Sequence, residues 1–247
     1  MRNLKLTIRY DGTEFYGWQT QPGFRTVQET IEKAIVEITR EEKVFVNCCG
    51  RTDSGVHAVG QVANVHTAST LSCAVLLKAI NSKLPDDVCI REICEMPLEF
   101  CANRNALRKM YRYVIQEGRL RDPFMRRYAW FVRQTLDADA MRRASRCLIG
   151  RHDFRCFETE WPNRRTSVRT ITHLAVNRFG EFLWIDVEGD GFLYNMVRAI
   201  AGTLVQVGRG YWPASQVEDI LKGMDRRLAG PTAPPEGLFL MRVTYPD

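Results

Sequence analysis

Hydrophobic and polar positions along the first third of the chain alternate between strand-like and helical spacing. The apolar run in residues 5–10 ends at Asp11-Gly12, which predicts a strand followed by a turn. Apolar side chains recur at helical spacing in residues 27–38, after a capping-box pattern formed by Thr26 and Glu29. Residues 44–48 and 61–67 predict two further strands, and a turn-rich loop joins them.

The rest of the chain continues this mixture of short strands and helices. The pattern predicts helices at 72–81, 136–148 and 193–207, a helix after a second capping box at Ser215 and Glu218, strands at 88–94, 110–116 and 238–245, and a hairpin within 171–188. Strands and helices in this order favour an α+β fold with a mixed, mostly antiparallel sheet. The two halves have a similar rhythm, so we expect a duplicated architecture divided into residues 1–103 and 104–247.

Composition narrows the class of protein. Hydrophobic residues make up 45% and charged residues 26% of the 247 residues, which excludes a disordered chain or a coiled-coil rod. The apolar runs are too short to cross a membrane and the N-terminus resembles a strand more than a signal peptide. We therefore expect a cytoplasmic protein with reduced cysteines. Cys147, His152 and Cys156 could meet at a metal, but without a Cys-x-x-Cys pair we predict neither metal nor cofactor.

Positive charge is concentrated in one segment. Residues 104–133 contain nine basic and two acidic residues, whereas the whole chain has a net charge of +6, so the remainder is close to neutral. Most of these basic residues are arginines, and tyrosine, phenylalanine and tryptophan lie among them. Guanidinium groups pair with phosphates and aromatic rings stack on bases. The segment therefore favours a nucleic-acid partner, although a solvated cationic surface has the same charge.

The loop Gly50-Arg51-Thr52-Asp53-Ser54-Gly55 is the strongest candidate for chemistry. Two glycines flank a carboxylate, and strands are predicted on both sides. Such a loop can hold Asp53 at the end of the sheet with its backbone close to a ligand. An Asx-turn, in which Asp53 only caps its own loop, fits the same residues.

The segment GRTDSGVHAVGQV at residues 50–62 resembles the signature of the tRNA pseudouridine synthase A family. Further matches follow the family's order along almost the whole chain: YDGT at 10–13, GWQxQ at 17–21, TVQ at 26–28, KMYRY at 109–113, GxHDF at 150–154, VRTI at 168–171, GxGFLYNMVR at 189–198, TAP at 232–234 and GLFL at 237–240. The resemblance implies the pseudouridine synthase fold, a sheet built from two ferredoxin-like halves flanked by helices. It also implies a homodimer without metal or organic cofactor that isomerises uridines at the end of the anticodon stem and loop of tRNA (tRNA positions 38 to 40).

The resemblance also implies roles for individual residues. Asp53 corresponds to the catalytic aspartate, which acts either as a nucleophile or as the base that removes a 2′ proton. Arg198 corresponds to its guanidinium partner, and Tyr111 to the active-site tyrosine that stacks on the uracil. From the residues alone, core packing is the usual role of a tyrosine at position 111. Arg198 would be a surface residue or, at the edge of the apolar helix face, a partly buried one.

Other positions are candidates for substrate binding. Arg51 corresponds to the arginine that helps to displace the target nucleotide, and Leu240 to an apolar residue against the uracil, although Leu240 also fits an ordinary strand core. In the basic segment, Arg104, Arg108 and Lys109 are candidates for phosphate contacts. The chain departs from the family at Asn103, where an arginine is usual, so Arg104 is a candidate substitute. Residues 161–165 fall where the family varies in length, and we assign them no role.

Two other functions are compatible with parts of this pattern. A non-catalytic RNA-binding module would tolerate replacement of Asp53, but the chain lacks the aromatic pattern of an RRM. A nucleoside hydrolase breaks the same glycosidic bond, but such enzymes typically need a second carboxylate, and the motif around Asp53 supplies one. Release of free uracil would distinguish the hydrolase from the isomerase.

Overall fold

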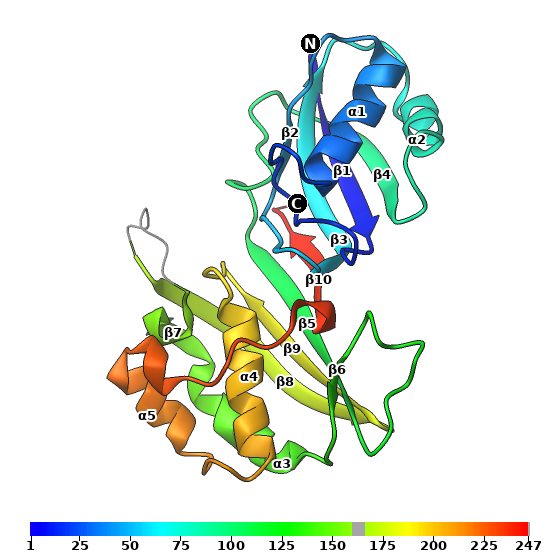
Figure 1. Cartoon of the computed structure of the whole chain (residues 1–247). Coiled ribbons are helices and arrows are strands. Elements are labelled where there is room, and N and C mark those ends of the chain that lie inside the picture. Colours follow the sequence, from blue (N-terminus) through cyan, green and yellow to red (C-terminus); the bar gives the residue numbers. More distant parts are fainter. Residues whose placement is uncertain (160–165, 247) are drawn as a thin grey trace. The chain divides into compact units, whose positions relative to one another are not determined.

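The structure is a computed structural model that describes residues 1–159 and 166–246. Residues 161–165, to which no role was assigned, lie outside the described part. The described chain divides into two compact units (Figure 1). Unit 1 comprises Met1–Leu107 together with Phe239–Asp247, and unit 2 comprises Arg108–Leu238.

Unit 1 is a mostly antiparallel sheet covered by two helices. Its elements follow the order β1 (Arg2–Tyr10), α1 (Val27–Thr39), β2 (Val46–Cys48), β3 (His57–Thr67), α2 (Cys73–Asn81) and β4 (Val88–Met96). The strands are arranged β4-β1-β3, and β2 pairs with the other edge of β3. This is the β-α-β-β-α-β arrangement of a ferredoxin-like motif, as the resemblance implied. The helices α1 and α2 pack on each other, and their apolar faces complete the core (Figure 1).

The chain's last strand, β10 (Leu238–Thr244), runs parallel to β3 within unit 1. Phe239 pairs with His57 and Leu240 pairs with Ala58. This pairing corrects the division into residues 1–103 and 104–247, because the end of the chain returns to the first unit and the boundary lies after Leu107. Local patterning predicts that a strand exists, but it does not reveal a partner so distant in sequence.

Unit 2 repeats much of the same order of elements. It contains β5 (Arg108–Glu117), β6 (Trp130–Val132), α3 (Ala138–Ser145), β7 (Gly150–Asp153), β8 (Val168–Phe179), β9 (Phe182–Gly189), α4 (Met196–Gly208) and α5 (Gln216–Gly223), with short 3-10 turns at Arg146–Leu148, Arg155–Phe157, Arg226–Leu228 and Pro235–Gly237. The sheet order is β5-β9-β8-β7, antiparallel throughout, and β6 adds a parallel pairing to β5. The helices α3 and α4 pack together, α3 against β8 and α4 against β5 (Figure 1). The predicted mixed, mostly antiparallel α+β fold is thus confirmed.

Both predicted capping boxes are wrong, although both helices exist. Thr26 and Ser215 stand at the N-caps of α1 and α5 without a side-chain capping hydrogen bond. The two carboxylates instead pair with lysines one turn further along, Glu29 with Lys33 at 2.7 Å and Glu218 with Lys222 at 2.6 Å. An i,i+4 ion pair on an exposed face competes for the same carboxylate as the cap.

Candidate active site

Asp53 lies in the loop between β2 and β3, residues 49–56, which we call the Asp53 loop. Its carboxylate is half-buried, whereas the neighbouring Arg51 is exposed and Thr52 is buried. The Thr52 hydroxyl lies 2.8 Å from the buried Tyr10 hydroxyl, and the Gln61 amide donates to the Gly50 carbonyl oxygen at 2.7 Å. Burial raises the pKa of Tyr10 far above its usual value, so this phenol stays neutral. These contacts tie the Asp53 loop to two strands of unit 1.

A second loop, residues 11–26 between β1 and α1, packs backbone against backbone on the Asp53 loop. The Trp18 amide donates to the Thr52 carbonyl oxygen at 3.0 Å, and the Gly55 amide donates to that of Phe15 at 3.3 Å. A Cβ on Gly17 would lie 2.7 Å from the Thr52 oxygen, and one on Gly12 would lie 2.0 Å from the Val56 oxygen. Only glycine permits this approach. The 11–26 loop therefore fixes the position of the Asp53 loop.

His57, the first residue after the Asp53 loop, connects this loop to the 11–26 loop. Its ring is 1% exposed and stacks on Phe239 at 4.7 Å between centroids. The ring Nδ1 accepts a hydrogen bond from the Gly12 amide at 3.0 Å and lies 3.2 Å from Asp11 Oδ1. These contacts give His57 a structural role in unit 1.

The remaining candidates in unit 1 lie on two different elements. Leu240 is fully buried on β10, beside Ala58, which lies five residues after Asp53. Arg104 is exposed in the turn that follows β4. Desolvation acts to raise the pKa of the neighbouring Cys101 thiol, but hydrogen bonds from Arg104, Asn103 and Asn47 outweigh it and lower that pKa. Part of the side chain of Arg104 is thus directed to a sulfur atom.

In unit 2, Tyr111 and Arg198 lie on the same side of the sheet. Tyr111 lies in β5, is 8% exposed and meets the ring of Phe192 edge-on at 5.1 Å. The contact between Phe192 and Tyr111 was not predicted. The sequence placed Phe192 in the matched segment 189–198 but did not indicate which side chain it contacts. Arg112, the next residue on β5, faces the other way, where it forms a bidentate pair with Asp186 and stacks over Trp184 at 4.0 Å.

Arg198 lies in the first turn of α4, half-buried, and its orientation is fixed by two oxygen atoms. Its Nε donates to the Ala233 carbonyl oxygen at 2.7 Å and one terminal nitrogen donates to Asn195 Oδ1 at 2.8 Å. Burial, followed by the charge of Glu236, raises the pKa of Tyr113, and the positive charge of Arg198 opposes this rise. Arg198 thus acts electrostatically on the face of β5 that carries Tyr111 and Tyr113.

Asp53 belongs to unit 1, and Tyr111 and Arg198 belong to unit 2. Within unit 2 the structure brings the predicted tyrosine and arginine to one face of β5. Within unit 1, Asp53 lies in the loop before β3, and Leu240 lies on β10 opposite Ala58 of β3. The joint action of the three catalytic candidates remains a prediction from the sequence.

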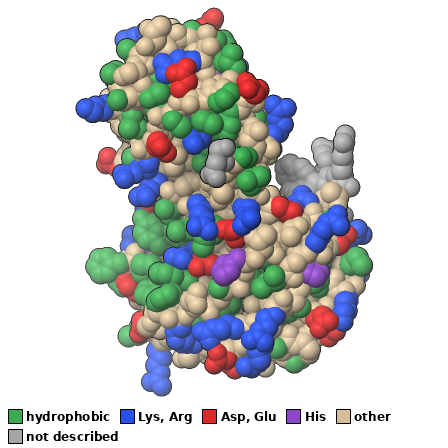
Figure 2. Space-filling view, turned by 180° about the vertical axis from the view of Figure 1, so that it is seen from behind, with side chains coloured by type: hydrophobic (Ala, Val, Ile, Leu, Met, Phe, Trp, Pro, Cys, Tyr) green, Lys and Arg blue, Asp and Glu red, His purple; other side chains and the backbone are tan. Residues whose placement is uncertain are grey.

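The basic segment extends from the end of unit 1 through β5 and β6. Arg108 is exposed and lies 3.5 Å from Glu188, and Lys109 is half-buried opposite Gly189. Between β5 and β6, a loop carries the exposed Arg119, Arg121, Arg126 and Arg127 together with Leu120 and Phe124, each 83% exposed. Lys and Arg side chains also occur elsewhere on the surface, many beside Asp or Glu (Figure 2). What distinguishes the basic segment is its composition along the chain, with nine basic and two acidic residues in 104–133.

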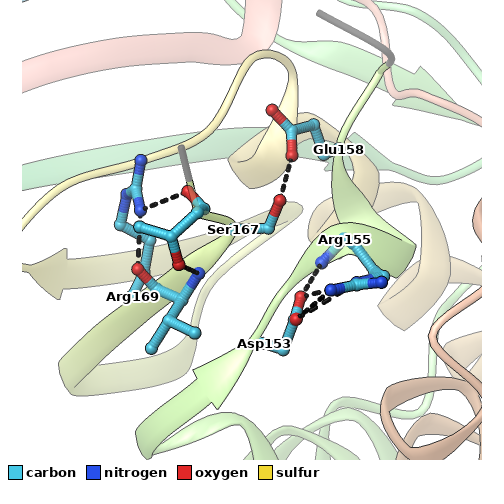
Figure 3. Close-up of polar contacts among 7 residues, drawn as sticks. Asp153, Arg155, Glu158, Ser167 and Arg169 are labelled. Carbon is cyan, nitrogen blue, oxygen red and sulfur yellow. Dashed lines mark hydrogen bonds and ion pairs between the residues drawn. The ribbon is translucent and has the colours of Figure 1, made fainter. Parts of the chain in front are cut away.

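Two matched segments meet where β7 pairs with β8. His152 is paired with Arg169 in this register, and the Phe154 amide donates to the Ser167 carbonyl oxygen at 3.0 Å. The Arg155 guanidinium embraces Asp153 and lowers the pKa of this carboxyl, while the Ser167 hydroxyl donates to Glu158 at 2.7 Å (Figure 3). The carboxylates of Asp153 and Glu158 therefore stabilise the local structure around this strand pair.

No group of three His, Cys, Asp or Glu side chains that could hold a metal occurs within residues 1–159 and 166–246. Over the same residues, no helix has the length and apolar character that crossing a membrane requires.

Comparison with known proteins gives consistent matches over the whole chain. The family profile described as tRNA pseudouridine synthase matches residues 6–104 and 144–246. The tRNA pseudouridine synthase A of Geobacter sp. (strain M21) is 45% identical over 248 residues, covering 100% of both chains. The proteins of the same name from Thermoanaerobacter sp. (strain X514) and Acetivibrio thermocellus are 42% and 44% identical, and each match covers 99% of this chain and 100% of the relative.

Proposed function

Because this chain belongs to the tRNA pseudouridine synthase family, whose members isomerise uridine to pseudouridine in tRNA, we propose that it acts at the end of the anticodon stem and loop. The target uridines are those at tRNA positions 38 to 40, and Asp53 is the catalytic carboxylate. The observation that carries this proposal is the way in which Asp53 is held. Asp53 is half-buried, and its loop is kept in place by close backbone packing at glycines and by buried hydrogen bonds. Preorganised groups of this kind contribute to catalysis because they need no reordering during the reaction.

The reaction exchanges one bond to the ribose for another. The N1–C1′ bond breaks, the uracil turns and C5 bonds to C1′. The C5 proton then leaves and N1 takes up a proton, so no atom is gained or lost overall. Asp53 serves either as the nucleophile at C1′ or as the base that takes the 2′ proton. Both routes need the carboxylate ionised, and neither requires a second carboxylate. This requirement distinguishes the isomerase from a glycoside hydrolase.

The other candidates complete the proposed site. The Tyr111 ring, set by its edge contact with Phe192, stacks on the uracil, and its hydroxyl handles the late proton transfer. Arg198, oriented by Ala233 and Asn195, supplies positive charge for the Asp53 carboxylate, and buried Leu240 contacts the uracil. Exposed Arg51 helps to evert the nucleotide, which offsets part of a cost of about a few kcal/mol in lost stacking and pairing.

We further propose that Arg104, Arg108 and Lys109 contact tRNA phosphates and that the enzyme acts as a cytoplasmic homodimer. Light scattering of the purified protein tests the dimer, since a mass of one chain at working concentration would contradict it.

The test of the catalytic assignment is Asp53→Asn, which keeps the size of the side chain and removes its charge. We expect pseudouridine, mapped by carbodiimide and primer extension on tRNA, to fall below detection while tRNA binding persists. Asp139→Asn makes the same change at an exposed position of α3 in unit 2, so it is the matched control and should retain activity. Undiminished pseudouridine in Asp53→Asn would contradict the assignment, and free uracil from the wild-type protein would indicate a hydrolase instead.

A further inference from the structure

Two exposed aromatic rings stack on each other in the 11–26 loop of unit 1. Tyr16 is 48% exposed and Phe24 is 47% exposed, and their ring centroids are 4.1 Å apart with an interplanar angle of 19°. Neighbouring rings of this loop behave differently, because Phe15 is 2% exposed and Trp18 is 1% exposed. The loop thus buries two aromatic side chains in the core and keeps two others at the surface.

The stacked pair is held rigidly by its own loop. The Tyr16 amide donates to the Arg25 carbonyl oxygen at 2.8 Å, and the Phe24 amide donates to that of Gln21 at 3.2 Å. Arg25 lies over the Phe15 ring at 4.0 Å and forms two hydrogen bonds with Asp87, at 2.7 and 2.8 Å. The pair therefore meets solvent with its position already fixed, so little conformational entropy is lost when a ligand binds.

The same loop is joined to the Asp53 loop on both sides of Tyr16. The carbonyl oxygen of Phe15, the preceding residue, accepts from the Gly55 amide and from the Ser54 hydroxyl at 3.3 Å. Gly17, the following residue, packs against the backbone of Thr52 and Asp53. The distance from the aromatic pair to the Asp53 loop is thereby set within unit 1.

We propose that Tyr16 and Phe24 form a stacking platform for an unpaired nucleobase of the substrate RNA next to the uridine presented to Asp53. This inference rests on the proposed function and adds a binding subsite to it. Aromatic faces are the surfaces on which single-stranded bases stack, and the stacking tolerates any base because each has a π face. A nucleotide everted from a stem leaves neighbouring bases without a partner, and the platform offers them one.

The experiment compares leucine substitutions, which keep apolar bulk and remove the π face. Tyr16→Leu/Phe24→Leu should raise KM for a tRNA transcript by about tenfold, the effect expected for one lost base stack, with kcat changed less than twofold. Tyr16→Phe/Phe24→Tyr keeps both rings and should have the KM of the wild-type enzyme. The matched control is Phe179→Leu, because Phe179 is 51% exposed and contacts Trp184 at 4.3 Å at the hairpin end of unit 2.

A second readout reports stacking directly. tRNA carrying 2-aminopurine next to the target uridine is bound to protein with the Asp53→Asn substitution, in which chemistry is blocked. We expect the platform to quench the 2-aminopurine fluorescence, and Tyr16→Leu/Phe24→Leu to abolish this change while Phe179→Leu retains it.

The outcomes separate the two proposals. Absence of pseudouridine with the wild-type enzyme would contradict the proposed function itself. With an active wild type, unchanged KM and unchanged quenching in the double variant would overturn the platform. A fall in kcat at constant KM would also overturn it, because it would show that the pair only supports the Asp53 loop.

Discussion

At the scale of single residues, the surroundings of a side chain determine its chemistry more than its type does. Cys101 and Cys147 are both half-buried, but hydrogen bonds from Arg104 and Asn47 reach the sulfur of Cys101, whereas burial dominates at Cys147. The pKa of the Cys101 thiol is lowered and that of Cys147 is raised. The sequence contains eight cysteines and does not indicate how their thiol pKa values differ. The structure distinguishes Cys101 from Cys147 by their surroundings.

We predict that Cys101 reacts with iodoacetamide before Cys147 as pH is raised toward neutrality. The thiolate is the nucleophile, and a lower pKa means that more thiolate is present at a given pH, so the alkylation rate should differ on the order of tenfold. Peptide mass spectrometry across a pH series measures both rates in one sample. Equal rates at every pH would show that the hydrogen bonds do not favour the thiolate.

Substitutions at Gly17 and Gly23, two glycines of the 11–26 loop, distinguish the effect of backbone strain from that of steric contact with the Asp53 loop. Both have a left-handed backbone, with φ of 81° and 82°. A Cβ on Gly17 meets the Thr52 oxygen at 2.7 Å, whereas one on Gly23 meets nothing within 4 Å. We expect Gly23→Ala to cost about 1 kcal/mol of stability with little loss of activity.

Gly17→Ala should cost more stability and also lower kcat/KM by about 100-fold, because it displaces the Asp53 loop. Denaturant unfolding and single-turnover kinetics measure the two effects. Equal activities of Gly17→Ala and Gly23→Ala would show that the 11–26 loop does not position Asp53.

At the scale of elements, helices and strands follow the hydrophobic pattern, whereas their ends depend on contacts from elsewhere. The helix predicted at 72–81 forms as α2, with Ser72 as its N-cap accepting from the Val75 amide at 3.3 Å. Short strands such as β6 and β7, of three and four residues, were not predicted. Segments of this length contain too few alternations to differ from a loop, and pairing with β5 and β8 makes them strands.

Glu117, at the end of β5, joins this strand to β8 and to the segment that precedes α3. Its carboxylate pairs with Arg178 on β8 and accepts from the Leu136 amide at 2.8 Å, and Arg178 donates to the Leu136 carbonyl oxygen at 2.6 Å. Glu117 is 3% exposed. Glu117→Gln leaves Arg178 without its charge partner and should destabilise unit 2 by about 3 kcal/mol.

Urea unfolding followed by circular dichroism measures this loss. The exposed pair of Asp139 with Arg142 provides the control, since Asp139→Asn should cost less than about 1 kcal/mol. Comparable losses in the two variants would mean that the cluster around Glu117 does not secure the end of β5.

At the scale of the whole molecule, charge is distributed unevenly along the chain. Residues 104–133 hold most of the positive excess, and the loop between β5 and β6 exposes four arginines. Each arginine that meets a phosphate releases condensed cations from the RNA. Affinity for tRNA should therefore fall steeply as the salt concentration rises.

We predict that Arg119→Gln/Arg121→Gln reduces the slope of log affinity against log salt concentration by about 1 to 2. Filter binding over a range of potassium chloride concentrations measures this slope. Arg91→Gln/Arg143→Gln removes the same charge from exposed positions outside the basic segment and should leave the slope nearly unchanged. If both variants behave alike, the interaction depends on net charge and not on the basic segment.

The sequence by itself determined the class of fold, most of the helices and strands, and the candidate catalytic loop, because hydrophobic periodicity and ordered motifs are properties of neighbouring residues. Only the tertiary structure decided that β10 returns to unit 1, that Gly12 and Gly17 set the position of the Asp53 loop, and that Tyr16 and Phe24 stack at the surface. These features arise from contacts between segments that are distant along the chain, or from the direction in which a backbone turns. A pattern of side-chain types records neither.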